Sequence, residues 1–393
     1  MISVEEALAR ILAMVSRLDA ETVTLRQAAN RVLAADAVAR LNQPPFAASA
    51  MDGYAIHNDD HHPGRKLRVI GEAGAGHAFS GRIGTGEAAR IFTGAPIPEG
   101  ANRVVLQEDV NRDADCIILG QRLEKSDHIR PLGQDFKLGD RLRAPQRLRP
   151  ADLSLLASMN LPEVEVACRP QVAILSTGDE LVMPGEAPRA DQIIASNAFA
   201  LAAMAEEAGA EVRLLPLARD NEDSLRFAFS LAAGADVIVT SGGASVGDHD
   251  LVGKVARDLG LEQNFWKVAM RPGKPLMAGR LGSSVMLGLP GNPVSAIVCG
   301  HLFMLPLLAH LQGLQGRHAP RKARLAAAVE GNGPRTHYMR AELAEGEYGP
   351  IITPMGRQDS ALLSILTKAN ALLIRPISDG PRAAGEMAEY LPI

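Results

Sequence analysis

The chain has 393 residues, which indicates two or three domains rather than a single core. Its formal net charge of −4 provides no general basic field, which argues against a nucleic-acid partner, and it has no run of 18 apolar residues free of polar side chains, which argues against a membrane span. Its three widely separated cysteines argue against a disulfide framework and fit a reducing cytoplasm.

The N-terminal 44 residues are predicted to form two helices. Ser3 and Glu6 match a capping box ahead of an amphipathic pattern, and Thr24 with Gln27 indicates a second helix start. The acidic residues of the first turn do not fit the cationic start of a signal peptide. Because residues 150–161 (PADLSLLASMNL) are helical again, we expect residues 1–44 and 141–168 to form one helical domain.

Residues 45–140 are predicted to form a small β domain inserted between these helical segments. Short β-like runs alternate there with glycine-rich turns: LRVIGEAG, AARIFTG, NRVVLQEDV and DCIILGQRL. Three tight segments of small residues, AASAMDGYAI, IFTGAPIPEGA and RPLGQDFKLGD, contain Asp52, Thr93 and Asp135. Taken alone, these three segments are ordinary turns of a β domain.

A regular alternation of strands and helices begins after residue 169. A buried strand is expected at 172–177 and further strands at 211–217 and 236–241, and the run SVMLGLPG (284–291) leads into a long apolar helix from about Asn292. Other helices are expected at 196–209, 221–234 and 249–260. This alternation favours right-handed βαβ units and a parallel sheet over residues 169–319. Short strands return in 320–393, a C-terminal β domain.

Three loops leave strands at the edge of this sheet where ligands usually bind: STGDEL (176–181), TSGGASVGDHD (240–250) and GLPGNPVS (288–295). Glycine and hydroxyl groups suit a phosphate. The acidic residues of the first two loops would repel a phosphate unless a cation lay between them, and Mg²⁺ prefers such oxygen ligands. The alternative is that Asp248 or Asp250 only caps the following helix.

Arg271 and Lys274 flank a Pro-Gly turn in RPGKP (271–275). Two cations on a rigid turn suit a tetrahedral or pyrophosphate anion. The alternative is an ordinary surface turn. The segment is not a P-loop, because the pattern G-x-x-x-x-G-K-[ST] does not occur in the chain.

Six segments in this order resemble the MoeA/gephyrin E-domain family, whose members are molybdopterin molybdenumtransferases: SAMDGYA, FTGAPIP, STGDEL, TSGGASVGDHD, RPGKP and GLPGNPVSA. The resemblance covers essentially the whole chain. It implies a multidomain α/β and β fold, with a central parallel-sheet α/β domain of the molybdopterin-binding type, an inserted small β domain, a helical N-terminal segment and a C-terminal β domain.

The resemblance also implies an activity. Molybdate would be inserted into adenylylated molybdopterin with release of AMP, with Mg²⁺ as the cofactor, in a cytoplasmic enzyme. It implies a homodimer, with the helical domain in dimerisation, in which the α/β domain of one subunit faces the inserted domain of the other. The molybdopterin adenylyltransferase is a further expected partner.

Site residues follow by position within the matched segments. The expected catalytic residues are Asp52, Thr93, Asp135 and Glu180, and the expected magnesium ligands are Asp220 and Asp250. The expected substrate and nucleotide contacts are Gly242, Gly243, Ser245 and Asn292. The expected molybdate contacts are Arg271, Lys274, Ser295, Arg340 and Ser364.

The chain departs from the family at four places, of which Ala244, where a valine is common, is a small change. Arg271 stands where the family usually has lysine, Asp359 replaces one residue of a serine pair, and Thr367-Lys368 replaces an Arg-Ser pair. Two other functions are considered: a molybdopterin adenylyltransferase-like enzyme, which would consume ATP and needs only the α/β domain, and a non-catalytic scaffold like gephyrin.

Overall fold

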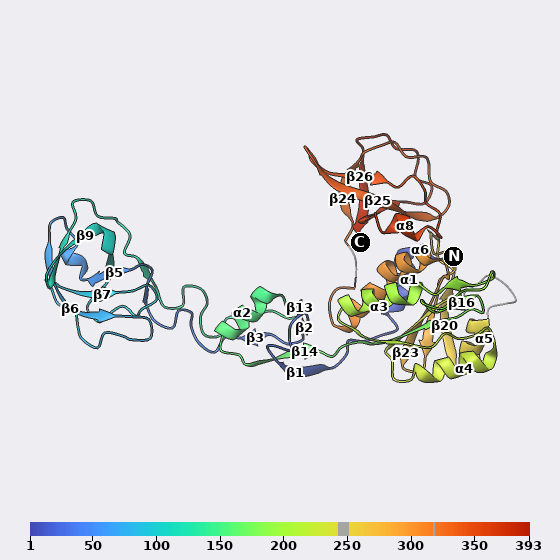
Figure 1. Cartoon of the computed structure of the whole chain (residues 1–393), viewed down its shortest axis with the longest axis horizontal. Coiled ribbons are helices and arrows are strands. Elements are labelled where there is room, and N and C mark those ends of the chain that lie inside the picture. Colours follow the sequence, from blue (N-terminus) through green and yellow to red (C-terminus); the bar gives the residue numbers. More distant parts are fainter. Residues whose placement is uncertain (243–250, 317–318) are drawn as a thin grey trace. The chain divides into compact units, whose positions relative to one another are not determined.

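The protein is represented by a computed structural model, in which residues 1–242, 251–316 and 319–393 are described. The chain divides into two compact units. Unit 1 comprises Met1–Glu21 with Val166–Ile393, and unit 2 comprises Thr22–Glu165. The segments of both units can be followed by colour in Figure 1.

A six-stranded sheet forms the centre of unit 1, in the order β18-β15-β19-β23-β22-β20. Its parallel strands are β18 (Glu211–Leu214), β15 (Gln171–Ser176), β19 (Val237–Ser241) and β23 (Ser284–Leu289). At one edge, β22 (Met277–Leu281) and β20 (Leu261–Trp266) run antiparallel. The predicted parallel sheet is therefore confirmed, with an antiparallel addition.

Helices cover both faces of this sheet (Figure 1). They are α3 (Asn197–Glu207), α4 (Glu222–Leu231), α5 (Leu251–Asp258) and a continuous helical stretch of α6 (Pro293–Cys299), the π-helical Gly300–Met304 and α7 (Leu305–Leu311). Val172 and Ile174 of β15 belong to the core shared with α3 and α6, whereas Ala173 and Leu175 belong to the core shared with α4 and α5. Successive strand residues point to opposite faces, so the continuous apolar run of β15 fills both cores.

The stretch Pro293–Leu311 is long and apolar enough to cross a membrane by length and composition alone, but 72% of it is buried inside the protein. Val294, Val298 and Leu302 pack in the larger core of unit 1. This packing is that of a core helix.

The first predicted helix is confirmed as α1 (Val4–Leu12), where the Ser3 Oγ accepts the backbone N–H of Glu6 at 3.1 Å. Val4, Ala7 and Ile11 pack into the core of the α/β domain. Residues 1–21, which the sequence groups with 141–168, thus belong to unit 1.

The second predicted helix of residues 1–44 is wrong. The backbone N–H of Thr24 donates to the Gln27 Oε1, as in a capping box, but the Thr24 hydroxyl also donates to this oxygen instead of accepting the backbone N–H of Gln27. However, this segment forms only turns between β1 (Ala20–Thr24) and β2 (Val32–Leu33), and Asn30 has φ +60°. Pairing of β2 with β13 (Gln146–Arg147) overrides the local helix signal.

The C-terminal region of unit 1 is a closed barrel, because β25 pairs with both β26 and β27. The barrel strands, with one short helix α8 (Leu363–Leu366), are β24 (Arg321–Leu325), β25 (Thr336–Gly346), β26 (Gly349–Pro354), β27 (Ala371–Arg375) and β28 (Met387–Pro392). The short β21 (Met270–Arg271) adds to β25 in parallel, which connects the RPGKP turn to the barrel.

Unit 2 confirms a β domain within the predicted insertion. A six-stranded sheet has the order β8-β5-β7-β6-β10-β9. Its strands are β5 (Gly53–Ile56), β6 (Lys66–Ala73), β7 (Glu87–Ile91), β8 (Arg103–Leu106), β9 (Val110–Asp113) and β10 (Cys116–Leu119).

Unit 2 also holds a smaller sheet in the order β1-β14-β2-β13, where β14 is Glu163–Ala167. The predicted helix at 150–161 is present as α2 (Pro150–Ser158). Two short strand pairs also occur in this unit: β3 (Ala37–Val38) pairs with β12 (Arg141–Leu142), and β4 (Ala48–Ser49) pairs with β11 (Ile129–Arg130). Two 3₁₀ turns span Asn58–Asp60 and Gln107–Asp109. In unit 1, β16 (Leu181–Val182) pairs with β17 (Ile193–Ile194).

Candidate functional site

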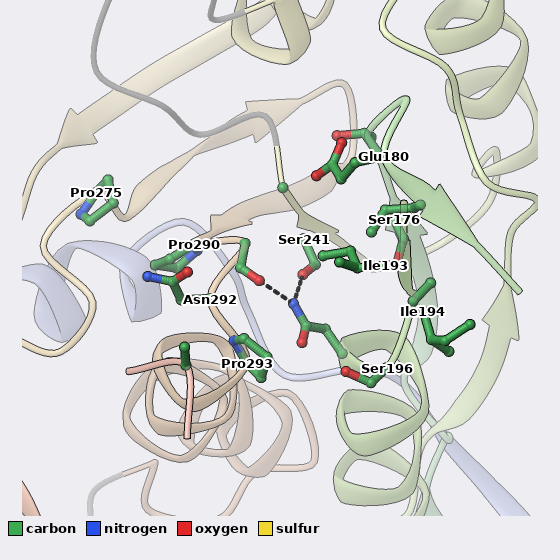
Figure 2. A pocket seen from close by; sticks show the side chains of 17 residues that line it. Ser176, Glu180, Ile193, Ile194, Ser196, Ser241, Pro275, Pro290, Asn292 and Pro293 are labelled. Atoms are coloured by element: carbon green, nitrogen blue, oxygen red, sulfur yellow. Dashed lines mark hydrogen bonds between the residues drawn. The ribbon is translucent and has the colours of Figure 1, made fainter. Parts of the chain in front are cut away.

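A cavity of about 560 Å³ opens at the carboxyl ends of the parallel strands of unit 1 (Figure 2). All three strand-end loops singled out in the sequence line it. Ser176, Thr177 and Glu180 come from the end of β15 and the loop after it, Ser241 and Gly242 from the end of β19, and Pro290, Gly291 and Asn292 from the loop after β23. The predicted convergence of these loops is therefore confirmed for the described residues.

Asn197, the first residue of α3, joins two of these loops. Its Nδ2 donates to the Ser241 Oγ at 2.8 Å and to the Gly291 carbonyl oxygen at 2.7 Å (Figure 2). One side chain therefore fixes the end of β19 relative to the loop after β23. The sequence signal that could have found Asn197 is its place directly after Ser196, at the start of a helix that follows a strand-end loop.

Polar atoms at this edge of the sheet lack partners. The side-chain oxygens of Thr177 (Oγ1), Asn197 (Oδ1) and Thr240 (Oγ1) are buried with no hydrogen bond to any part of the chain that the structure describes. Two of these residues, Thr177 and Asn197, line the cavity. Since a buried polar atom is costly when unpaired, these atoms fit a site whose hydrogen bonds are completed by a ligand.

Gly242 brings the ends of two strands into close contact. Its φ is +100°, and a Cβ at this position would lie 2.4 Å from the Thr177 carbonyl oxygen. Only glycine fits both the backbone conformation and the space. The glycine predicted to allow close backbone approach does so here.

A second cavity, of about 530 Å³, adjoins the first, because Pro275 and Asn292 line both. It brings together the predicted residues Arg271, Lys274 and Ser295, of which Ser295 is only 4% exposed. Its other walls are formed by further residues of the turn 271–275 and by residues of the C-terminal barrel: Pro272, Gly273, Arg335, Gln358, Asp359 and Ser360.

Two predicted molybdate contacts do not line either cavity. Arg340 is only 1% exposed, and its guanidinium donates to the backbone carbonyl oxygens of Arg357, Asp359 and Leu362 at 2.9–3.1 Å. It thus holds the loop that carries the cavity wall. Ser364 is exposed on α8.

Ser360 was missed by sequence reasoning. It lines the second cavity, and its Oγ accepts a hydrogen bond from the Asn292 Nδ2 at 3.0 Å. The signal was present, because Ser360 directly follows Asp359, the residue at which the chain departs from the family's serine pair.

The acidic residues lie at the ends of β15 and β18. The Glu180 side chain packs over Gly178, so closely that a Cβ at Gly178 would lie 2.3 Å from its carboxylate. The backbone N–H of Asp220 donates to the Asp179 carboxylate at 3.2 Å. The predicted residues Gly243, Ser245 and Asp250, together with Asp248, lie outside the described residues.

The donor chemistry of this edge fits Mg²⁺, which prefers carboxylate oxygens. Within residues 1–242, 251–316 and 319–393, however, no group of three or more His, Cys, Asp or Glu side chains is arranged to hold a metal ion.

In unit 2, the predicted residues Asp52 and Thr93 form a pair. The Thr93 backbone N–H donates to the Asp52 carboxylate at 2.7 Å and its hydroxyl at 2.8 Å. These two bonds, the backbone one first, lower the pKa of Asp52 below its usual range, so the carboxylate is charged. No described hydrogen bond connects Asp135 to this pair, and the backbone N–H of Asp135 donates to the Gln43 carbonyl oxygen.

Fold and site together define a class. This is a multidomain protein whose α/β domain has a polar cavity at the strand ends, beside a cationic cavity completed by a C-terminal β barrel.

Three family models match the chain in order: "MoeA N-terminal region (domain I and II)" over residues 2–160, "Probable molybdopterin binding domain" over 173–310 and "MoeA C-terminal region (domain IV)" over 322–393.

Similar proteins agree over nearly the whole length. The chain is 38% identical to a molybdopterin molybdenumtransferase of Haemophilus influenzae, over 95% of this chain and 93% of the relative, and 34% identical to one of Nostoc, over 96% and 90%. A crystal structure of a molybdopterin biosynthesis moeA protein from Pyrococcus horikoshii is 28% identical with a TM-score of 0.86, covering 100% of both chains. The chain belongs to the MoeA family.

Proposed function

We propose that this protein is a molybdopterin molybdenumtransferase, which inserts molybdate into adenylylated molybdopterin and releases AMP. The observation that carries the proposal is the pair of adjoining cavities that share Pro275 and Asn292. One cavity offers hydroxyl and amide groups and the Glu180 carboxylate at strand ends, and the other offers cations. Two substrates of different chemistry would thus bind side by side.

The first cavity would hold the adenylylated pterin. Close backbone approach at Gly242 and the unpaired oxygens of Thr177 and Asn197 suit the hydroxyl, amide and phosphate groups of a nucleotide-linked substrate. Asn292, at the start of α6, would mark the boundary between the two substrates, since it lines both cavities. Gly243 and Ser245 would add further contacts from the loop after β19.

The second cavity would hold the molybdate dianion on Arg271, Lys274 and Ser295. Two cations and a hydroxyl suit a tetrahedral oxyanion, because charge-assisted hydrogen bonds are stronger than neutral ones. Arg340 would act from behind this wall by holding the loop 357–362 in place. The substrate class here is a tetrahedral dianion, so tungstate would also fit.

Asp220 and Asp250 would hold Mg²⁺, with Glu180 close by. When bound, the ion would supply positive charge against the pyrophosphate and stabilise the negative charge that builds up on the departing AMP. The backbone of Asp220 is held in place by Asp179, whose carboxylate accepts the Asp220 backbone N–H.

The rest of the assembly follows from the family. We expect a cytoplasmic homodimer in which Asp52, Thr93 and Asp135 of one subunit complete the site of the other, and we expect the molybdopterin adenylyltransferase to deliver the substrate. The charged Asp52 carboxylate, held by Thr93, is prepared for such a role.

The test is AMP release from adenylylated molybdopterin and Mg²⁺, measured with and without molybdate, for the wild type and Asp250→Asn. AMP release that requires molybdate and is lost in the variant, with its fold retained, would support both the proposed reaction and the proposed role of Asp250 in the loop TSGGASVGDHD. Consumption of ATP would instead identify an adenylyltransferase-like enzyme. Tight substrate binding without any release, with tungstate as well, would identify a scaffold.

A further inference from the structure

Arg335 lies in the wall of the second cavity, beside Arg271 and Lys274. Within the described residues, its guanidinium forms no hydrogen bond or ion pair with the protein. The position of such a long side chain depends on the backbone from which it extends. The groups that hold the backbone of Arg335 therefore decide how its guanidinium faces the cavity.

A strand ladder fixes the backbone on the C-terminal side of Arg335. The N–H of Thr336 donates to the Ala269 carbonyl oxygen at 2.9 Å, and β25, which begins at Thr336, pairs in parallel with β21. On the N-terminal side, residues 333–334 are exposed and belong to no strand. Arg335 therefore needs a second anchor ahead of β25.

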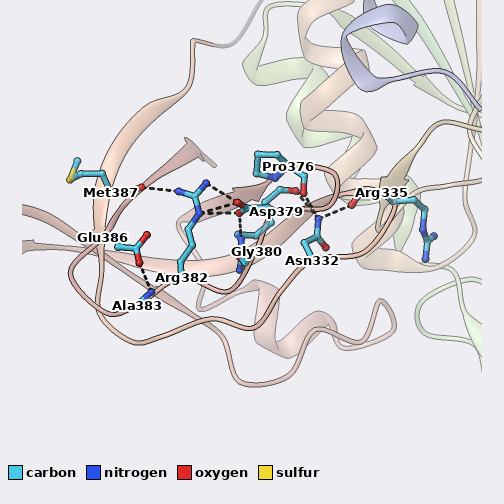
Figure 3. A network of polar contacts seen from close by, with 10 residues as sticks. Asn332, Arg335, Pro376, Asp379, Gly380, Arg382, Ala383, Glu386 and Met387 are labelled. Atoms are coloured by element: carbon cyan, nitrogen blue, oxygen red, sulfur yellow. Dashed lines mark hydrogen bonds and ion pairs between the residues drawn. The ribbon is translucent and has the colours of Figure 1, made fainter.

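The side-chain amide of Asn332 provides this anchor (Figure 3). Its Nδ2 donates to the carbonyl oxygens of Arg335 at 2.8 Å, Arg375 at 3.0 Å and Pro376 at 2.7 Å. The two protons of one amide thus serve three acceptors. Figure 3 shows the Arg335 side chain directed away from Asn332, so the amide holds the backbone and leaves the guanidinium to the cavity.

The segment on the other side of this anchor is itself held by ion pairs. Arg375, at the end of β27, is only 2% exposed, and its Nε donates to the Asp379 carboxylate at 2.6 Å. The same carboxylate accepts the Nε of Arg382 at 3.0 Å. The backbone N–H of Asn332 also donates to the Asp379 carbonyl oxygen at 2.7 Å. Asn332 thus connects Arg335 to an ion-pair network of the barrel.

We infer that Asn332 is the positioning residue of Arg335, and that its amide fixes the backbone from which the guanidinium reaches an oxyanion in the second cavity. The identification of the oxyanion as molybdate rests on the proposed function. A bidentate guanidinium contact depends on the distances and angles of two N–H groups at once, so a small displacement of the backbone weakens it. Loss of the amide should therefore weaken anion binding, although the amide itself does not touch the anion.

The test is a double-mutant cycle on molybdate binding, in which Asn332→Ala is combined with Arg335→Gln. Binding is measured by calorimetry on the full chain, without any pterin. Asn370→Ala is the matched control: the Asn370 Nδ2 also joins barrel segments, donating to the Leu343 carbonyl oxygen at 3.0 Å, but Asn370 lines neither cavity. Thermal unfolding shows whether each variant is folded. Asn332→Ser is a milder second variant, since one hydroxyl donates a single hydrogen bond.

We expect Asn332→Ala to weaken molybdate binding by about fivefold when Arg335 is present. The same change should have no effect in the Arg335→Gln background, because the contact through which it acts is already lost. Asn332→Ser should weaken binding less than Asn332→Ala does, and Asn370→Ala should bind molybdate as tightly as the wild type.

Equal losses from Asn332→Ala in both backgrounds would overturn the inference, as would an unchanged affinity in Asn332→Ala or a wild type that binds no molybdate. A loss in Asn370→Ala as large as that in Asn332→Ala would also overturn it, because the effect would then come from a weakened barrel. If the cycle shows the expected coupling but the wild type releases no AMP, the proposed function fails and the inference stands. AMP release together with equal losses in both backgrounds would give the reverse result.

Discussion

At the residue scale, His337 is a buried histidine of β25 on which four arginine charges act. It is 7% exposed, and its pKa is lowered to about 4, first by burial and then by the charges of Arg271, Arg375, Arg335 and Arg340. The imidazole is therefore neutral in the folded protein at neutral pH. In the unfolded chain it binds a proton with a pKa of about 6.5.

This difference predicts a pH dependence of stability. Between pH 6.5 and 4 the unfolded chain binds a proton that the folded protein does not, so the contribution of His337 is fully present above pH 6.5 and is lost as the pH falls through 4. We expect the free energy of unfolding to fall by about 3 kcal/mol over this range from this residue alone. Urea unfolding of the wild type and His337→Gln at each pH isolates the effect, and identical pH profiles of the two proteins would contradict it.

Site residues that follow a strand were predictable from sequence, and those held by tertiary contacts were not. Glu180, Gly242 and Asn292 lie at strand ends, where topology alone brings them together. Arg335 precedes a barrel strand and reaches the cavity only because β21 pairs with β25. Arg340 has a charged side chain that a sequence reading assigns to an anion, whereas burial against three carbonyl oxygens makes it part of the scaffold.

At the element scale, the junction of β19 with β15 depends on Gly242. We expect Gly242→Ala to abolish most AMP release, because the new Cβ would meet the Thr177 carbonyl oxygen and force the strand end away from the cavity. Gly234→Ala is a matched control, since Gly234 also has positive φ, at +77°, but has nothing within 4 Å of the new Cβ.

In both glycine variants an alanine at positive φ strains the backbone. This strain should lower the free energy of unfolding by about 1–2 kcal/mol, measured by thermal or urea unfolding. Only the variant at the strand junction should also lose activity. Equal activity losses in Gly242→Ala and Gly234→Ala would show that backbone strain causes the loss of AMP release, and not a displacement of the strand end at Gly242.

The elements themselves were predicted well where one pattern dominates. The βαβ alternation of unit 1 was clear because β15 and β19 are continuous apolar runs and α4 begins with a recognisable cap, in which the Asn221 side chain accepts the backbone N–H of Ser224. The segment after Thr24 shows the opposite case. One of its bonds, from the Thr24 backbone N–H to the Gln27 side chain, matches a helix start. The following residues nevertheless pair with Gln146–Arg147, more than a hundred residues away, and no local pattern carries that information.

At the scale of the whole molecule, the proposed homodimer makes a prediction that separates composite sites from sites built by one chain. Asp52→Asn changes unit 2 and Lys274→Ala changes unit 1, and each variant alone should be inactive as a homodimer. In a mixed dimer whose sites combine unit 1 of one subunit with unit 2 of the other, one site carries both changes and the other carries neither.

Mixed dimers, isolated through two different affinity tags, should therefore recover about half of the wild-type AMP release per dimer. If each site is built from a single chain, both sites of the mixed dimer carry one change, and no activity returns. A mixed dimer of Lys274→Ala with Arg271→Ala is the control, because both changes lie in the same cavity. It should remain inactive under either arrangement, so recovery confined to the first pair can only come from sites shared between subunits.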